Sequence, residues 1–198
     1  RAFIASEWSR HADVEFYPAG PSATASHTAI LLRAWKERDS ITYPFVVMED
    51  DVYRVGDFTR YWNRLPELRG ADYVCFDAMF LRCGKKRADP FVALDEHRAM
   101  GLNVYYRSFF DRFATARELE RCIGRTVDMQ MTHDRRLVKW TPAEQVCRQV
   151  VGKLSTTAGA VTWHYAELYD RAARMLAGAR VWPPPAEGRC VWRGGTAT

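Results

Sequence analysis

Short apolar runs that end in acids recur along the chain. The clearest, residues 45–48, has neither polar alternation nor a helical period, which is typical of a buried strand in a parallel sheet. Three acids follow it directly: Glu49, Asp50 and Asp51. A second apolar run, residues 71–77, predicts another strand and ends at Asp77. Residues 91–94, 102–106 and 137–140 predict further short strands.

Helical spacing of apolar residues fills the intervals between these strands. The pattern predicts helices over residues 26–38, 58–65, 115–122 and 158–179. Their expected boundaries are Ser26 or Thr24 as the first N-cap, Asp57 as the second with Pro66 after it, and Thr115 or Ser108 as the third with Gly124 as its stop. Residues 82–90 are basic and polar, and predict a loop. Alternating helices and strands indicate an α/β protein with a central, mostly parallel sheet flanked by helices.

The acid triplet is the best candidate for chemistry. Three adjacent carboxylates repel one another and resist desolvation, and a divalent cation is a common way to offset that cost. In open α/β sheets, ligands bind just outside the carboxyl ends of the strands, where this triplet is expected. The alternative is a solvated acidic turn that merely ends a strand. Side chains alternate along a strand, so Glu49 and Asp51 would share one face and Asp50 would point elsewhere.

Length and composition fit one folded domain. The chain has 198 residues, of which 47% are hydrophobic and 13% aromatic. We expect one domain over residues 1–180, followed by a Pro- and Gly-rich tail or linker over residues 181–198. No apolar run approaches the roughly 20 residues of a membrane helix, so no membrane segment is expected. The first residue is Arg1 and not Met, which suggests a piece of a longer polypeptide.

Charge and cysteine content argue against several classes of function and indicate a compartment. The net charge is +5, but the basic residues are dispersed apart from residues 85–87 and 135–136, so the stripe expected of a nucleic-acid-binding protein is missing. The five cysteines are odd in number and include no CxxC, which argues against a zinc site and a disulfide framework. A reducing compartment follows, namely the cytoplasm, or the host-cell cytoplasm if the protein is viral.

One set of residues resembles a known family. Ser26 and His27 at a helix start, then Trp35, then Glu-Asp-Asp-Val at residues 49–52 resemble glycosyltransferase family 25, which includes lipooligosaccharide and collagen-type galactosyltransferases. Small viral glycosyltransferases are also similar. Weaker matches are residues 101–106, the step Val127-Asp128, and Gln145 followed by Ser155. The resemblance spans residues 10–157. The family's usual first strand is missing, and nothing matches beyond Ser155.

The resemblance implies a fold and an activity. The fold would be a single GT-A domain, a Rossmann-like unit that binds a nucleotide-sugar. The activity would be that of a hexosyltransferase in glycan biosynthesis, which moves a sugar from a UDP- or GDP-sugar to a hydroxyl of a glycan or glycoprotein, with inversion. Mn²⁺ or Mg²⁺ would neutralise the charge that develops on the diphosphate.

Each candidate residue receives a role under this hypothesis. Asp51 is the expected direct metal ligand, Glu49 shares its face, and His164 or His133 is a possible third ligand from the C-terminal half. Asp50 or Glu49 would contact the ribose, or the metal through water. Ser26 is placed near the nucleotide, and His27 has either a structural role or a place near the nucleotide. For the general base that takes the acceptor's proton, Asp128 is the first candidate and Asp77 the second.

Two other classes stay open at this point. A metal-dependent phosphoryl-transfer or nuclease domain also uses acid clusters, although it would need more converging acids and a basic track. A catalytically silent module of the same fold, which binds a sugar or a protein partner, is the other, because the base is unassigned.

Overall fold

The computed structural model describes residues 8–9, 13–18, 20–98, 101–124, 131–150 and 165–180. Asp128, Ser155, His164 and the tail over residues 181–198 lie outside this described part. The strands are β1 (Phe45–Met48), β2 (Val52–Arg54), β3 (Tyr73–Cys75), β4 (Met79–Ala88), β5 (Phe91–Arg98), β6 (Leu102–Tyr105), β7 (Lys139–Pro142) and β8 (Cys147–Gln149). The helices are α2 (Ala23–Lys36), α3 (Phe58–Trp62), α4 (Arg107–Asp111), α5 (Ala116–Ile123) and α7 (Tyr165–Arg180), with a 3₁₀ turn at Leu65–Glu67.

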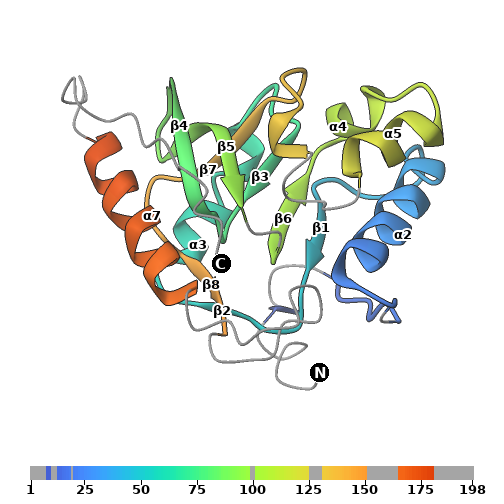
Figure 1. Ribbon diagram of the computed structural model, residues 1–198. Coiled ribbons are helices and arrows are strands. Elements are labelled where there is room, and N and C mark those ends of the chain that lie inside the picture. Colours follow the sequence, from blue (N-terminus) through green and yellow to red (C-terminus); the bar gives the residue numbers. More distant parts are fainter. Residues whose placement is uncertain are drawn as a thin grey trace, which may run out of the picture.

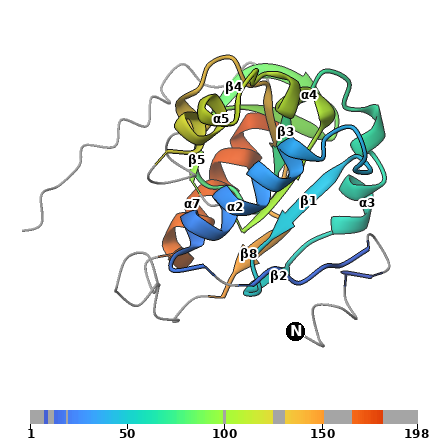
Figure 2. The same ribbon diagram turned by 90° about the vertical axis from the view of Figure 1, so that its right-hand side faces the viewer.

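The described strands form one large sheet and one small ribbon. The large sheet has six strands in the order β1-β6-β3-β7-β5-β4, and β2 pairs with β8 in the ribbon. Helices flank the sheet: α2 lies beside β1 and α7 beside β4, with α4 and α5 near one end (Figure 1). Seen from the side, α2 runs alongside β1 (Figure 2). The chain is therefore an α/β protein with a mixed sheet.

The expectation of a mostly parallel sheet is wrong. Among the described strands of the large sheet, only β3 and β7 pair in parallel, whereas the other four pairings are antiparallel. One reason is local. Asp89 and Pro90 alone join β4 to β5, and a two-residue connection makes an antiparallel hairpin, whereas parallel neighbours need a crossover of about a dozen residues.

Residues 82–88 form part of β4 and not the predicted loop. β4 is an edge strand of the large sheet, where charged residues are common because they discourage pairing with another chain. Arg82 is exposed and makes ion pairs across the hairpin with Glu96 at 3.2 Å and Asp95 at 3.6 Å. The polar composition that suggested a loop is thus also compatible with an edge strand, on which Arg82 is exposed.

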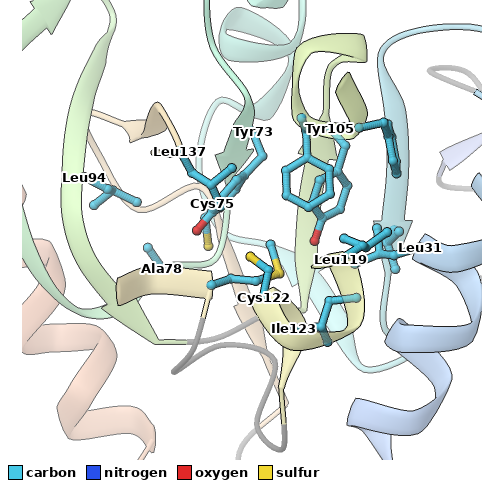
Figure 3. Packing of buried hydrophobic residues seen from close by; sticks show 14 of the residues in the cluster. Leu31, Tyr73, Cys75, Ala78, Leu94, Tyr105, Leu119, Cys122, Ile123 and Leu137 are labelled. Atoms are coloured by element: carbon cyan, nitrogen blue, oxygen red, sulfur yellow. The ribbon is translucent and has the colours of Figure 1, made fainter. Parts of the chain in front are cut away.

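Strand alternation divides the core between the two faces of the sheet. In β3, Tyr73 and Cys75 belong to one buried cluster, and Val74 belongs to the other. The first cluster packs residues of the sheet against α2, α4, α5 and α7, as Figure 3 shows for Leu31, Leu119 and Ile123 around Tyr105. The second cluster packs the opposite face against α3. Burial on both faces explains the continuous apolar run of β3. The prediction that residues 45–48 form a buried strand of a parallel sheet is wrong, because β1 is an edge strand that pairs antiparallel with β6 and only Val47 in it is buried.

Helix α2 begins earlier than the sequence suggested. Its N-cap is Ser22, whose hydroxyl accepts a hydrogen bond from the amide of Ala25 at 3.1 Å, so neither Ser26 nor Thr24 is the cap. His27 and Leu31 then fall on one buried face, four residues apart. The predicted N-caps Asp57 of α3 and Thr115 of α5 are confirmed, as is Gly124 at the end of α5. The predicted end of α3 is wrong, because the helix stops at Trp62 and Pro66 lies within the 3₁₀ turn that follows.

No helix within the described ranges combines the length and apolarity needed to cross a bilayer.

Candidate functional site

The three acids occupy a turn that connects the large sheet to the ribbon. Residues 49–51 follow β1 directly and lead into β2. The amide of Glu49 donates to the carbonyl oxygen of Gly101 at 2.7 Å, and the amide of Val150 donates to the carbonyl oxygen of Asp51 at 2.9 Å. The turn is thereby fixed at one end to the residue before β6 and at the other to the residue after β8.

The side chains of the turn differ in exposure. Asp50 is exposed, whereas Glu49 and Asp51 are partly buried, and Oδ1 of Asp51 is inaccessible to solvent. This pattern agrees with the division expected for the triplet, but its cause differs. The residues do not alternate along a strand. They form a turn whose ends are anchored by main-chain hydrogen bonds.

Two side chains hold the carboxylate of Glu49. Nε2 of His27 lies 3.1 Å from Oε1, and Nε2 of Gln149 donates to Oε2 in a short hydrogen bond. His27 comes from α2, and Gln149 from β8, so elements 22 and 100 residues away in sequence meet at one carboxylate. Because Oε1 accepts from His27, Nε2 of that ring carries the proton.

Asp77 lies directly behind the turn and is completely buried. Its Oδ2 accepts a hydrogen bond from the amide of Gly101 at 2.9 Å, and its Oδ1 accepts one from the amide of Leu102 at 3.0 Å. The thiol of Cys75 lies 3.6 Å from Oδ1. Both carboxylate oxygens are therefore committed to contacts within the protein.

Burial raises the pKa of the Asp77 carboxyl to about 7. The amides of Leu102 and Gly101 oppose this rise because they stabilise the ionised form, and the negative charge of Glu49 adds to it. The main chain of Gly101 also contacts both residues. The structure thus brings two of the predicted site residues, Glu49 and Asp77, into one electrostatic cluster.

Gly101 joins these groups through its main chain. Its carbonyl accepts from Glu49, and its amide donates to Asp77. A Cβ atom at this position would lie 2.5 Å from Oδ2 of Asp77, 2.6 Å from Cγ2 of Val52 and 3.0 Å from Cγ of Gln149. Only a glycine leaves room for the main chain to pass between these side chains.

The described contacts of two other predicted site residues, Ser26 and His133, are not with the acidic turn. The hydroxyl of Ser26 accepts from the amide of Gly20 at 2.8 Å and donates to the carbonyl of Ser22, so its described contacts are with the start of α2. His133 is exposed and faces Glu96 at 4.0 Å, not the acidic turn. The roles predicted for Asp128 and His164 stay predictions.

The glutamine singled out from the sequence was Gln145, whereas Gln149 is the one that lies at the site. Gln145 donates to the carbonyl oxygens of Ala78 at 3.3 Å and Cys147 at 3.1 Å. Gln149 instead reaches Glu49, because it pairs with Val52 across the ribbon, three residues after that acid. The only sequence signal for Gln149 is its place four residues beyond Gln145, and this did not reveal its partner.

Helix α7 also reaches the site, which the sequence did not suggest. The amide of Gln149 donates to the hydroxyl oxygen of Tyr169 at 2.9 Å, and Tyr169 is completely buried. Burial raises the pKa of this hydroxyl, and the charges of Asp77 and Asp51 raise it further. The negative charges of both acids therefore act on the hydroxyl of Tyr169.

The carboxylates of the turn suit a hard cation in part. Asp51 and Glu49 both offer oxygen ligands of the type that Mg²⁺ and Mn²⁺ prefer, and both oxygens of Glu49 also accept hydrogen bonds. Within the described ranges, no three His, Cys, Asp or Glu side chains are placed to hold a metal together.

Comparisons with protein-family models, with curated proteins and with solved structures find no match for this chain.

Proposed function

We propose that the chain is a metal-dependent glycosyltransferase domain of the GT-A type that binds a nucleotide-sugar at the turn over residues 49–51. The observation that carries the proposal is the held carboxylate of Glu49, fixed by His27 and Gln149 beside Asp51. Holding a charged group by two donors reduces the freedom it would lose when a ligand binds, which is a common feature of binding sites.

The residues of the turn divide the work under this proposal. Asp51 is the ligand for Mn²⁺ or Mg²⁺, and the bound cation would offset charge on the diphosphate leaving group. Glu49, whose carboxylate is oriented from both sides, accepts a hydrogen bond from a hydroxyl of the ribose or the sugar. Asp50 is exposed and free to face the nucleotide. His27 orients Glu49 and does not itself contact the ligand.

Burial argues against Asp77 as the general base. A base must approach the acceptor hydroxyl within hydrogen-bond distance, directly or through a water molecule. Both oxygens of Asp77 accept main-chain N–H groups, and its side chain has no exposed surface. We therefore assign Asp77 to the support of Gly101, and Asp128 stays the candidate base.

A ligand panel tests the proposal most directly. The melting temperature of the protein is measured with Mn²⁺, Mg²⁺ or EDTA, each with and without UDP-glucose, UDP-galactose, GDP-mannose or GDP-fucose. We expect one nucleotide-sugar to raise the melting temperature only when the metal is present, because binding to the folded state alone stabilises it. No stabilisation by any of these sugars with either metal would contradict the proposal.

Matched variants locate the response in the turn. Asp51→Asn should abolish the metal-dependent shift. Asp111→Asn should keep it, because Asp111 ends α4, which follows the other end of β6, and its carboxylate pairs with Arg107. A response that survives Asp51→Asn would show that the nucleotide-sugar binds elsewhere. Product analysis with the responding donor and a panel of glycan acceptors then separates a transferase from a silent binding module.

A further inference from the structure

At Gln149, helix α7 contacts the edge of β8 that faces away from β2. Hydrogen bonds cross the ribbon from Val55 to Val146 and from Val150 to Asp51, so these are the hydrogen-bonded pairs. Gln149 and Val52 form a pair between them, whose N–H groups point away from the partner strand. The amide of Gln149 therefore points out of the ribbon, where the hydroxyl oxygen of Tyr169 accepts it at 2.9 Å.

This contact continues to the acidic turn through a single residue. The side chain of Gln149 donates to Oε2 of Glu49, so the residue that Tyr169 holds by its main chain orients the central acid of the site by its carboxamide. All three groups are buried or partly buried, and Gln149 is only 9% exposed. A poorly solvated hydrogen-bond chain is stronger and more directional than one in water.

We propose that Tyr169 is a positioning residue of the acidic site, which orients Glu49 through Gln149. Helix α7 is then part of the functional unit, although it lies beyond the region that resembles known glycosyltransferases. For its effect on a nucleotide-sugar the inference rests on the proposed function. The positioning itself concerns the protein's own residues and is measured without a ligand.

The hydroxyl can be removed without removing the ring. The ring of Tyr169 packs against Met79 and Leu168 and lies 5.6 Å from the guanidinium carbon of Arg148. Tyr169→Phe keeps these contacts and leaves the amide of Gln149 without its acceptor. Tyr61→Phe is the matched control, because Tyr61 is equally buried and its hydroxyl donates to Glu144 at 2.9 Å, away from the acidic turn.

Nuclear magnetic resonance of the ligand-free protein gives the first readout. In Tyr169→Phe we expect the carboxamide protons of Gln149 to move toward the positions of a free glutamine. The amide of Gln149 should exchange with solvent roughly tenfold faster, as expected for the loss of one buried hydrogen bond. Tyr61→Phe should change neither signal. Unchanged carboxamide signals in Tyr169→Phe would overturn the inference.

A second variant separates the hydroxyl from a general loosening of α7. Asp170 is exposed and pairs with Arg148 at 3.1 Å, so Asp170→Asn weakens the attachment of α7 but keeps the hydroxyl of Tyr169. It should leave the carboxamide of Gln149 in place. If Asp170→Asn moves the carboxamide as far as Tyr169→Phe does, α7 acts only by packing and the inference is wrong.

A double-mutant cycle tests the route to the ligand. With UDP-glucose or UDP-galactose and Mn²⁺ as probes, Tyr169→Phe should weaken binding about tenfold in the wild-type background and have no further effect in Gln149→Ala. Equal losses in both backgrounds would show that Tyr169 does not act through Gln149. If none of the four nucleotide-sugars of the panel stabilises the wild-type protein with either metal, while the carboxamide still moves in Tyr169→Phe, the proposed function fails and the positioning stands.

Discussion

The amide of Gly101 donates to Oδ2 of Asp77 at 2.9 Å, and a Cβ atom on Gly101 would lie 2.5 Å from the same oxygen. The glycine is therefore required by its surroundings, since its described neighbours leave no space for a methyl group. This pair links the segment between β3 and β4, which carries Asp77, to the turn that carries Glu49, because the carbonyl of Gly101 accepts the amide of Glu49.

We expect Gly101→Ala to lower the free energy of unfolding by roughly 1–3 kcal/mol, the usual cost of overpacking a tight interior. Urea denaturation measures this loss. The comparison variant is Gly70→Ala, where a Cβ would meet nothing within 4 Å and the cost comes from a φ of +75° alone. Gly101→Ala should also shift the signals of Glu49, and Gly70→Ala should not. Wild-type stability in Gly101→Ala would show that the strand moves aside freely.

Asp77→Asn should destabilise the protein at neutral pH. A carboxamide offers one acceptor oxygen, so the amide of Gly101 or that of Leu102 loses its partner, at a cost of about 1–3 kcal/mol for a buried donor. Chemical denaturation of both proteins at pH 7 measures the difference. A variant as stable as the wild type would mean that the carboxylate is not needed to hold residues 101 and 102.

The same pair of proteins should differ in their response to pH. The pKa of Asp77 is raised to about 7, so its carboxyl holds a proton more tightly in the folded than in the unfolded state. The stability that this provides is complete below about pH 4 and is lost as the pH rises through about 7. The difference in the free energy of unfolding between the wild type and Asp77→Asn should therefore be largest near pH 4 and smaller at pH 8. A deficit that is constant with pH would contradict the raised pKa.

Lys139 is a buried cation, in contrast to the buried carboxyl of Asp77. Main-chain carbonyl oxygens hold its ammonium group. Its ammonium group donates to the carbonyl oxygens of Asp95 at 3.2 Å, Asp134 at 3.4 Å and, in a short contact, Thr132. Burial lowers its pKa, with partial compensation from the charge of Asp95. Lys139→Met keeps the length of the side chain but leaves these carbonyls without a donor, and we expect a loss of at least about 2 kcal/mol in urea denaturation.

The lowered pKa of Lys139 also predicts a pH response. The unfolded chain binds the proton more tightly than the folded protein, so the stability of the wild type should rise with pH in the range just below the ordinary lysine value of 10.5. Lys139→Met has no such group and should lack this rise. Parallel stability curves for the two proteins from pH 8 to 10.5 would contradict the assignment.

Local features were predictable from the sequence where short-range physics decides them. Asp57 and Thr115 cap helices because their side chains accept main-chain amides three residues ahead, and the apolar run at residues 45–48 forms β1. The mixed sheet was not predictable in this way, because pairing between β1 and β6 depends on contacts over more than 50 residues. The prediction of a loop at residues 82–88 was wrong for a related reason, since a solvated edge strand and a polar loop share a composition.

The same distinction applies to the site. The acids were visible in the sequence, because three carboxylates after an apolar run are unusual. Their supporting residues were not, since Gln149 meets Glu49 only through the register of the ribbon, and Tyr169 meets Gln149 only through the docking of α7. Neither register nor docking leaves a local pattern in the residues concerned.

The contact between Glu49 and Gln149 permits a charge-swap test of that register. Gln149→Glu alone would place two carboxylates against each other, and Glu49→Gln alone would bring two carboxamides together and leave the Nε2 of His27 with a poorer acceptor. Both single variants should lose roughly 1–3 kcal/mol in urea denaturation at pH 7.

The double variant Glu49→Gln/Gln149→Glu restores a carboxamide opposite a carboxylate. We therefore expect it to be more stable than Gln149→Glu alone, with a coupling of roughly 0.5–3 kcal/mol as is usual for residues in contact. Only the partner of His27 is not restored, because that ring then faces a carboxamide, so recovery should be incomplete. His27→Asn in the double variant should consequently cost less than His27→Asn in the wild type. Strictly additive losses would show that Glu49 and Gln149 do not meet in solution, and the support of the acidic turn from β8 would have to be abandoned.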